Sequence, residues 1–150
     1  MEKTCLAAST RNIIYGADKR VGFHPRPRKG KVMAEAGLCI AWGDVVKGSE
    51  KRALEAYGES MQYFGRLQEE GRIERFEVVV LAPTGGDVGG FWLLRGTEEQ
   101  IDSVRRSEEY VTLIQRVQLV VTGLRIADAF LDEGLVQVMG SYQKLVDELA

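Results

Sequence analysis

The stretch "PTGGDVGGFWLLRG", from Pro83 to Gly96, decides the fold. Clustered glycines before an apolar run can form a phosphate-binding loop, but such a loop needs a helix N-terminus behind it to present backbone N–H groups to the anion. Here "FWLLRG" follows the glycines and has the composition of a strand. The glycine spacing also fits neither G-x-G-x-x-G nor G-x-x-x-x-G-K-[ST]. We therefore predict a hairpin connection, with glycines supplying positive φ and with Gly89 and Gly90 allowing a bulge or close backbone approach.

The strand before this loop, "IERFEVVVLAP" from Ile73 to Pro83, is apolar on both faces over its second half. One layer of helices covers only one face of an antiparallel sheet, so the pattern indicates that something else covers the second face. A partner subunit would do so. The alternation places Phe76, Val78, Val80 and Ala82 on one face, and Glu77, Val79 and Leu81 on the other.

The remaining elements follow from periodicity and capping signals. A helix from Ser49 to Gly71 is predicted to turn Leu54, Tyr57, Met61 and Phe64 inward, with Tyr57 in the core and Tyr63 at its edge. Thr97 and Gln100 form a capping box, and Ser107 caps the next helical piece. The other predicted segments are a strand over Leu38–Val46, a strand from Val120 or Val121 to Phe130, and a final amphipathic helix over Leu135–Leu149.

The predicted order is strand, helix, strand, strand, helix, strand, which is the ferredoxin-like βαββαβ arrangement of an α+β protein with an antiparallel sheet, here with an extra C-terminal helix. From about Gly37 to Phe130 the chain resembles the dimeric α+β barrel superfamily, in which two such sheets pack face to face. It is also similar to an uncharacterised bacterial family within that superfamily, through "YFGRLQEEGRIERFEVVVLAP", "GGFWLLRG" and "RSEEY". The resemblance implies a homodimer. Because the superfamily includes cofactor-independent monooxygenases, haem-degrading enzymes, isomerases, dehydratases and ligand-binding proteins, it implies no single activity.

Composition indicates one globular domain in the cytoplasm. A chain of 150 residues and 16.7 kDa is sufficient for one core, and no apolar run approaches the roughly 20 residues that span a bilayer. Cys5 and Cys39 provide neither a disulfide framework nor a CxxC spacing, which favours a reducing compartment. We expect no membrane association.

Charge divides the chain into two parts. Residues 1–32 contain eight basic and two acidic groups, a net charge of +6, whereas the remainder contains twelve basic and twenty acidic groups, a net charge of −8. "FHPRPRKGK", with the single histidine His24, has neither helical nor strand periodicity. We predict a flexible basic arm over residues 1–36 and one ferredoxin-like domain over residues 37–150. The arm is either a solvated tail or upstream of a true start at Met33. A role in nucleic-acid binding is disfavoured because only Phe23 interrupts the basic run.

Residues 37–150 contain no histidine, because the single histidine lies in the predicted arm. This reduces the number of catalytic and ligand-binding chemistries that the domain can support. Axial ligation of haem by histidine, histidine metal sites and imidazole acid–base catalysis are all disfavoured. We therefore predict no cofactor and no metal, and interpret Cys39 as a buried thiol. Three strand residues, Trp42, Asp44 and Arg95, are the candidates for ligand binding.

Two interpretations of Arg95 remain open. Arg95 and Asp44 could form a structural ion pair, or Arg95 could meet an acidic or carbonyl oxygen of a ligand near the Thr97 helix N-terminus. Three functions remain open too. The first is a homodimer that binds a small, partly apolar molecule between sheet and helices. The second is a cofactor-independent enzyme acting on an aromatic or polyketide-like substrate. The third is a structural or regulatory interaction module.

Overall fold

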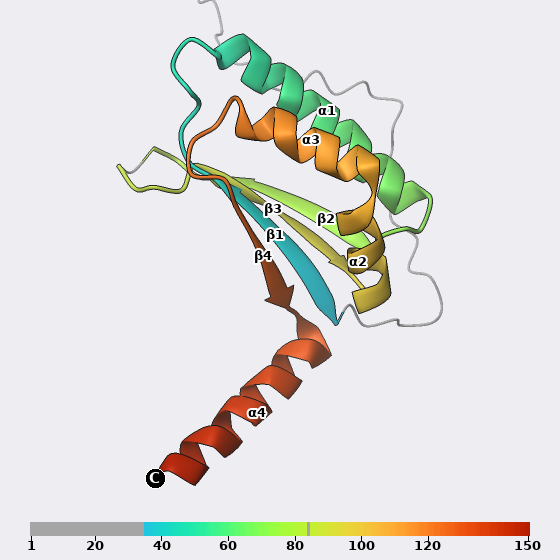
Figure 1. Cartoon of the computed structure of the whole chain (residues 1–150), viewed down its shortest axis with the longest axis vertical. Coiled ribbons are helices and arrows are strands. Elements are labelled where there is room, and N and C mark those ends of the chain that lie inside the picture. Colours follow the sequence, from blue (N-terminus) through green and yellow to red (C-terminus); the bar gives the residue numbers. More distant parts are fainter. Residues whose placement is uncertain (1–34, 84) are drawn as a thin grey trace, which may run out of the picture. The chain divides into compact units, whose positions relative to one another are not determined.

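The computed structural model describes residues 35–83 and 85–150, which form eight elements (Figure 1). Residues 1–34, which hold most of the predicted basic arm, lie outside the described residues. None of the described helices has the length and apolarity needed to cross a membrane. The elements are β1 (Ala36–Trp42), α1 (Glu50–Glu69), β2 (Arg75–Val80), β3 (Gly90–Gly96), α2 (Glu98–Arg106), α3 (Glu108–Gln118), β4 (Arg125–Phe130) and α4 (Asp132–Leu149).

The four strands form one antiparallel sheet in the order β2-β3-β1-β4. β1 uses both of its hydrogen-bonding edges, pairing Leu38 with Leu94 of β3 and with Asp128 of β4. β2 and β4 are the two edge strands. This order and the βαββαβ succession are those of the ferredoxin-like fold, which confirms the predicted fold class, and α4 is the predicted additional C-terminal helix.

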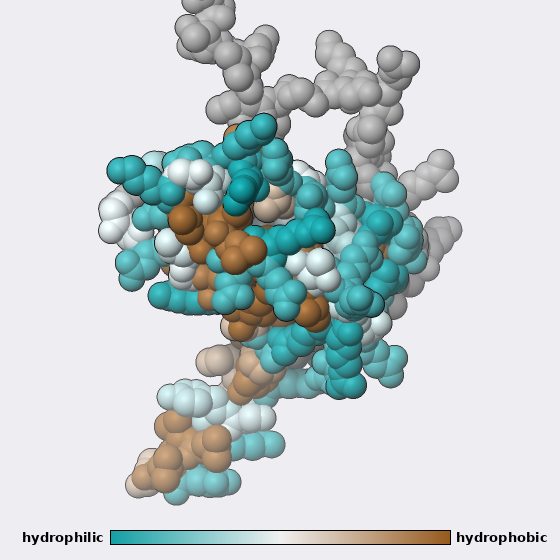
Figure 2. Space-filling model, turned by 45° about the horizontal axis from the view of Figure 1, so that its top comes forward, coloured by the Kyte–Doolittle hydropathy of each residue, from teal (hydrophilic) through white to brown (hydrophobic). Residues whose placement is uncertain are grey.

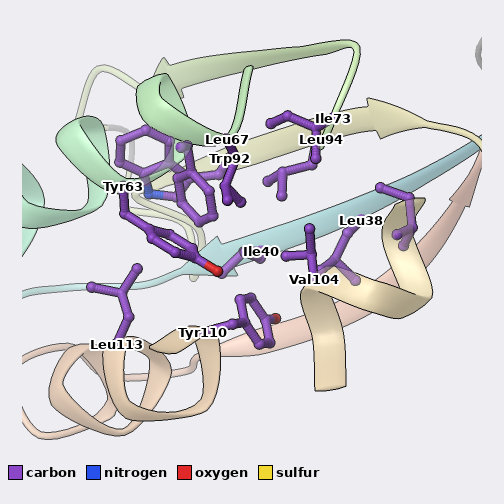
Figure 3. Close-up of a cluster of buried hydrophobic side chains, with 12 residues drawn as sticks. Leu38, Ile40, Tyr63, Leu67, Ile73, Trp92, Leu94, Val104, Tyr110 and Leu113 are labelled. Carbon is purple, nitrogen blue, oxygen red and sulfur yellow. The ribbon is translucent and has the colours of Figure 1, made fainter. Parts of the chain in front are cut away.

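The core lies between one face of the sheet and the layer formed by α1, α2 and α3 (Figures 1 and 3). Trp92 of β3 is at its centre, with ring centroids 5.3 Å from Phe64, 5.4 Å from Tyr57 and 6.1 Å from both Trp42 and Phe76. Aromatic rings thus fill much of the space between sheet and helices. The fully buried side chains are Leu38, Ile40, Phe64, Leu67, Ile73, Leu94 and Val104.

Three strands are shorter than predicted: β2 covers Arg75–Val80 instead of Ile73–Pro83, and β1 and β4 are shortened because the chain turns at Gly43 and Gly123. Gly43 N–H donates to the carbonyl of Thr122 over 2.7 Å, and Gly123 has a φ of 60°. These contacts end β1 at Trp42 instead of Val46, and β4 begins at Arg125 instead of Val120 or Val121. The remaining apolar residues still pair, but only as the isolated bridge between Val45 and Val121.

The buried side of α1 differs from the predicted one. Tyr63 is in the core, Leu54 is 74% exposed and Tyr57 is 39% exposed. The reason is that α1 packs against α3 as well as the sheet, so its buried side points between the two. Tyr63 Oη lies 3.2 Å from the Ser107 hydroxyl at the start of α3, an orientation that periodicity within α1 cannot specify. The buried residues of α1 are Ala56, Ser60, Tyr63, Phe64 and Leu67.

The predicted glycine loop and helix caps are confirmed. A Cβ on Gly90 would lie 2.5 Å from the Val79 carbonyl oxygen and 2.5 Å from a ring carbon of Trp42, so only glycine fits there. Gly85 supplies a positive φ of 75°. The Thr97 side chain and Gln100 form both hydrogen bonds of a capping box, and the Ser107 hydroxyl accepts from the Tyr110 N–H.

Leu67→Ala should lower the free energy of unfolding by about 2–5 kcal/mol, because it leaves a cavity against the sheet. Leu54→Ala on the same helix is the matched control and should change it by no more than about 0.5 kcal/mol, since Leu54 is largely exposed. Urea denaturation followed by circular dichroism measures both values. Equal losses for the two variants would contradict the assigned orientation of α1.

Candidate functional site

The face of the sheet opposite α1, α2 and α3 is open and apolar at its centre (Figure 1). Cross-strand pairing places Val79 beside Phe91, and Cys39 beside Leu93 and Ala127. Most of these side chains are half-buried by their neighbours within the sheet. We call this surface the open face. It consists of Arg75, Glu77, Val79, Phe91, Leu93, Arg95, Gly37, Cys39, Ala41, Arg125, Ala127 and Ala129.

Arg95 lies on the open face, but its partner is Glu77 and not Asp44. Arg95 Nε is 3.2 Å from Glu77 Oε1, and Arg75 Nη2 is 3.2 Å from the same oxygen. Arg95 is opposite Gly37 in the register, whereas Asp44 follows the other end of β1, where its backbone N–H donates to the Thr122 hydroxyl over 3.0 Å. The predicted ion pair between Arg95 and Asp44 is therefore wrong. Residue spacing could not reveal this, because register decides which side chains meet across strands.

Trp42 lies on the other face of the sheet. It shares its side of β1 with Ile40, and its ring contacts Trp92 in the aromatic core. The three candidate ligand-binding residues thus do not converge: Arg95 is on the open face, Trp42 is on the core side and Asp44 lies beyond the end of β1. A ligand contact remains a prediction for each residue separately, because no single ligand can touch all three.

A groove of about 430 Å³ lies between α2, the outer ends of β1 and β4, and the first turns of α4. It lies at the margin of the space between sheet and helices, and neither Trp42 nor Arg95 lines it. Apolar walls alternate with acidic side chains. The apolar lining includes Ala36, Ile101, Phe130 and Val138, and the carboxylates are Glu35, Glu98, Asp102 and Asp128.

Two of these carboxylates are neutralised by arginines of α2. Arg106 lies 3.6 Å from Asp102, and Arg105 pairs with Asp128. Glu35 and Glu98 form no ion pair within the described part of the chain, so the lining carries two carboxylates that these arginines do not neutralise. No local sequence pattern indicates this groove, because its lining combines segments that are far apart in the chain, residues 35–37, 98–102, 128–130 and 134–141.

Two further hollows have larger volumes than this groove. One, of about 610 Å³, runs between α1 and α3, where Arg66 pairs with Glu109, and Arg116 lies 3.0 Å from Glu59. The other, of about 590 Å³, lies beside the glycine loop and includes Asp44 and Arg125. The ion pairs of the first join two helices, which is a structural role.

Two tyrosines, Tyr63 and Tyr110, are buried in the core and have raised pKa values. Burial raises the pKa of Tyr110 to about 12, and its hydroxyl has no hydrogen-bond partner among the described residues. Burial also raises the pKa of Tyr63, against the opposing effect of its bond to Ser107. Both phenols are therefore neutral near pH 7. Residues 35–83 and 85–150 contain no group of three or more potential metal ligands.

Solved structures that are similar to this chain have low sequence identity to it. No protein-family model and no curated protein sequence matches the chain. A dimeric protein of unknown function and ferredoxin-like fold from Bacteroides fragilis is similar at 10% identity and a TM-score of 0.49, over 63% of this chain and 95% of that chain. SnoaB, a cofactor-independent oxygenase from Streptomyces nogalater, is similar at 9% identity and a TM-score of 0.46, over 67% of this chain and 95% of that chain.

A double-mutant cycle should separate the two possible partners of Arg95. Arg95→Met and Glu77→Gln should show a coupling free energy of about 0.2–1 kcal/mol, the range for partly exposed ion pairs. The effects of Arg95→Met and Asp44→Asn on the free energy of unfolding should be additive. Arg95 lies beside the first residues of β1, whereas Asp44 follows its last residue. Chemical denaturation of the single and double variants measures both couplings. Coupling to Asp44 alone would refute the observed pairing.

Proposed function

We propose that the protein is a homodimer in which two sheets pack through their open faces. The observation that supports this is the apolar centre of the open face around Val79, Phe91 and Leu93, which no helix of the described residues covers. A contiguous apolar surface of this kind marks an interaction site. A second copy is a fitting partner, because an isologous C2 interface pairs the same surface of both subunits and two sheets pack about 10 Å apart.

The charges on the open face are compatible with such pairing. Arg95 and Glu77 neutralise each other within one subunit, so their partial burial does not leave an isolated charge in the interface. Arg75 also lies beside Glu77, and its side chain is 66% exposed. These groups belong to a polar rim around the apolar centre, as in many protein interfaces.

Val79→Asp should raise the dissociation constant of the dimer at least about a hundredfold, because it places an unpaired carboxylate in a desolvated interface. Val80→Asp is the matched control: Val80 is the next residue of β2, points to the other side and is 67% exposed. Sedimentation equilibrium over a concentration series measures both constants. A wild-type protein that stays monomeric at every concentration would end the homodimer proposal.

The groove between α2, β4 and α4 supports the binding of a small, partly apolar molecule. Its volume of about 430 Å³ is within the usual range for ligand sites, and its walls combine aliphatic and aromatic surface with polar groups. The two carboxylates of the lining that form no ion pair favour a neutral or positively charged molecule over a carboxylate, unlike the acidic ligand expected for Arg95. Binding is favoured over catalysis, because the domain has no histidine and its buried tyrosines are neutral near pH 7.

Thermal-shift screening with matched sets of small aromatic amines and aromatic carboxylates tests this part of the proposal. Amines should raise the melting temperature more than carboxylates do. Phe130→Ala should weaken the affinity for the amines about tenfold by removing an apolar wall of the groove. Val136→Ala is the control, because Val136 is exposed on α4 and outside the groove lining. If neither set shifts the melting temperature, the interaction-module alternative is the better account.

A further inference from the structure

Helix α4 has an apolar stripe that its own domain leaves exposed. The helix extends from the end of β4, and none of its residues is buried (Figure 1). Its apolar side chains recur every three or four residues and so lie along one side of the helix. Figure 2 shows them gathered on this projecting helix at the bottom of the view. The most exposed members of the stripe are Leu135, Met139, Tyr142, Leu145 and Leu149, at 47–89% of their surface.

The stripe begins beside the open face of the sheet. Leu131 connects β4 to α4, and its Cδ1 lies only 2.7 Å from the place where a Cβ on Gly37 would be. Gly37 is paired with Ala129, and both belong to the open face. The N–H of Leu135 donates to the Leu131 carbonyl over 3.2 Å, which starts the stripe one turn further along. Leu131 therefore links the open face to the first turn of α4, where the stripe begins.

The charges of α4 and of the open face are opposite. α4 carries Asp132, Glu133, Asp147 and Glu148 against the single base Lys144. The open face carries Arg75, Arg95 and Arg125 against Glu77. Arg125 is exposed and forms no ion pair with the part of the chain that the structure describes. A surface that bears both an acidic helix and a basic face is complementary to a second copy of itself.

We propose that α4 belongs to the dimer interface, with the apolar stripe of each copy packed against the second copy beside the paired sheets. This inference rests on the proposed homodimer and extends it. A second copy suits the stripe because the stripe begins beside the open face, through which the two copies are proposed to pair. In a C2 dimer, the α4 helix of each subunit is then buried against the other subunit. Within its own subunit α4 contacts the end of β4 and leaves its stripe in water.

Hydrogen exchange of the α4 amides is the direct test. In the wild-type dimer the amides of residues 136–149 should exchange at least about a hundredfold more slowly than in the wild-type protein diluted below its dissociation constant, because an undocked helix frays and opens. Val79→Asp gives a second monomeric sample. Equal exchange in dimer and monomer, whether fast or slow, would overturn the inference while leaving the homodimer in place.

A pair of adjacent substitutions on α4 supplies the matched comparison. Leu145→Glu, on the stripe, should raise the dimer dissociation constant at least about tenfold by placing a charge in the interface. Lys144→Glu, off the stripe, should change it less than about threefold. If Leu145→Glu leaves the constant unchanged while Val79→Asp raises it, the homodimer stands and the role of α4 fails. If the wild-type protein is monomeric throughout, both fail.

Discussion

The packing of Trp92 against the rings of α1 and of the neighbouring strands is the interaction on which the rest of the structure depends. Trp92 is in a central strand; its contacts with Phe64 and Tyr57 join α1 to the sheet, and its contact with Phe76 joins β3 to β2. Large aromatic side chains contribute much of the buried area of a small core. Because these rings occupy the space above β3, the hollow suited to a ligand lies at the margin, where α2 and α4 meet the ends of β1 and β4.

The sheet divides the molecule into two surfaces with different requirements. Its core side is covered by three helices, whereas its open face combines an apolar centre with the Arg95–Glu77 pair. In an antiparallel sheet, side chains alternate strictly between faces, so a strand that is apolar at successive positions must supply both surfaces. Exposure of apolar surface to water is unfavourable, and the proposed dimer and the proposed docking of α4 would both remove such surface from water.

Local signals predicted the fold well. The alternation in β2 and the Thr97 capping box depend on neighbours within a few residues, and the close approach at Gly90 depends on the two strands beside it; all three predictions are confirmed. Errors arose where distant segments meet. Strand β1 ends early because Gly43 bonds to Thr122, which is far away in the chain, and the helix face of α1 is turned toward Ser107 of the neighbouring helix. Periodicity within one element cannot report on either contact.

At the candidate site, too, local sequence patterns did not specify which distant residues come into contact. The sequence by itself determined an α+β chain with a two-sided apolar strand, no histidine in residues 37–150, and a glycine loop followed by a strand instead of a helix, because composition and alternation carry those properties. Only the tertiary structure decided which side chains meet. Register placed Arg95 beside Glu77 and away from Asp44, and the fold brought α2, the ends of β1 and β4, and the first turns of α4 together around the acidic groove. Cross-strand neighbours are set by pairing over long chain separations, which no local pattern encodes.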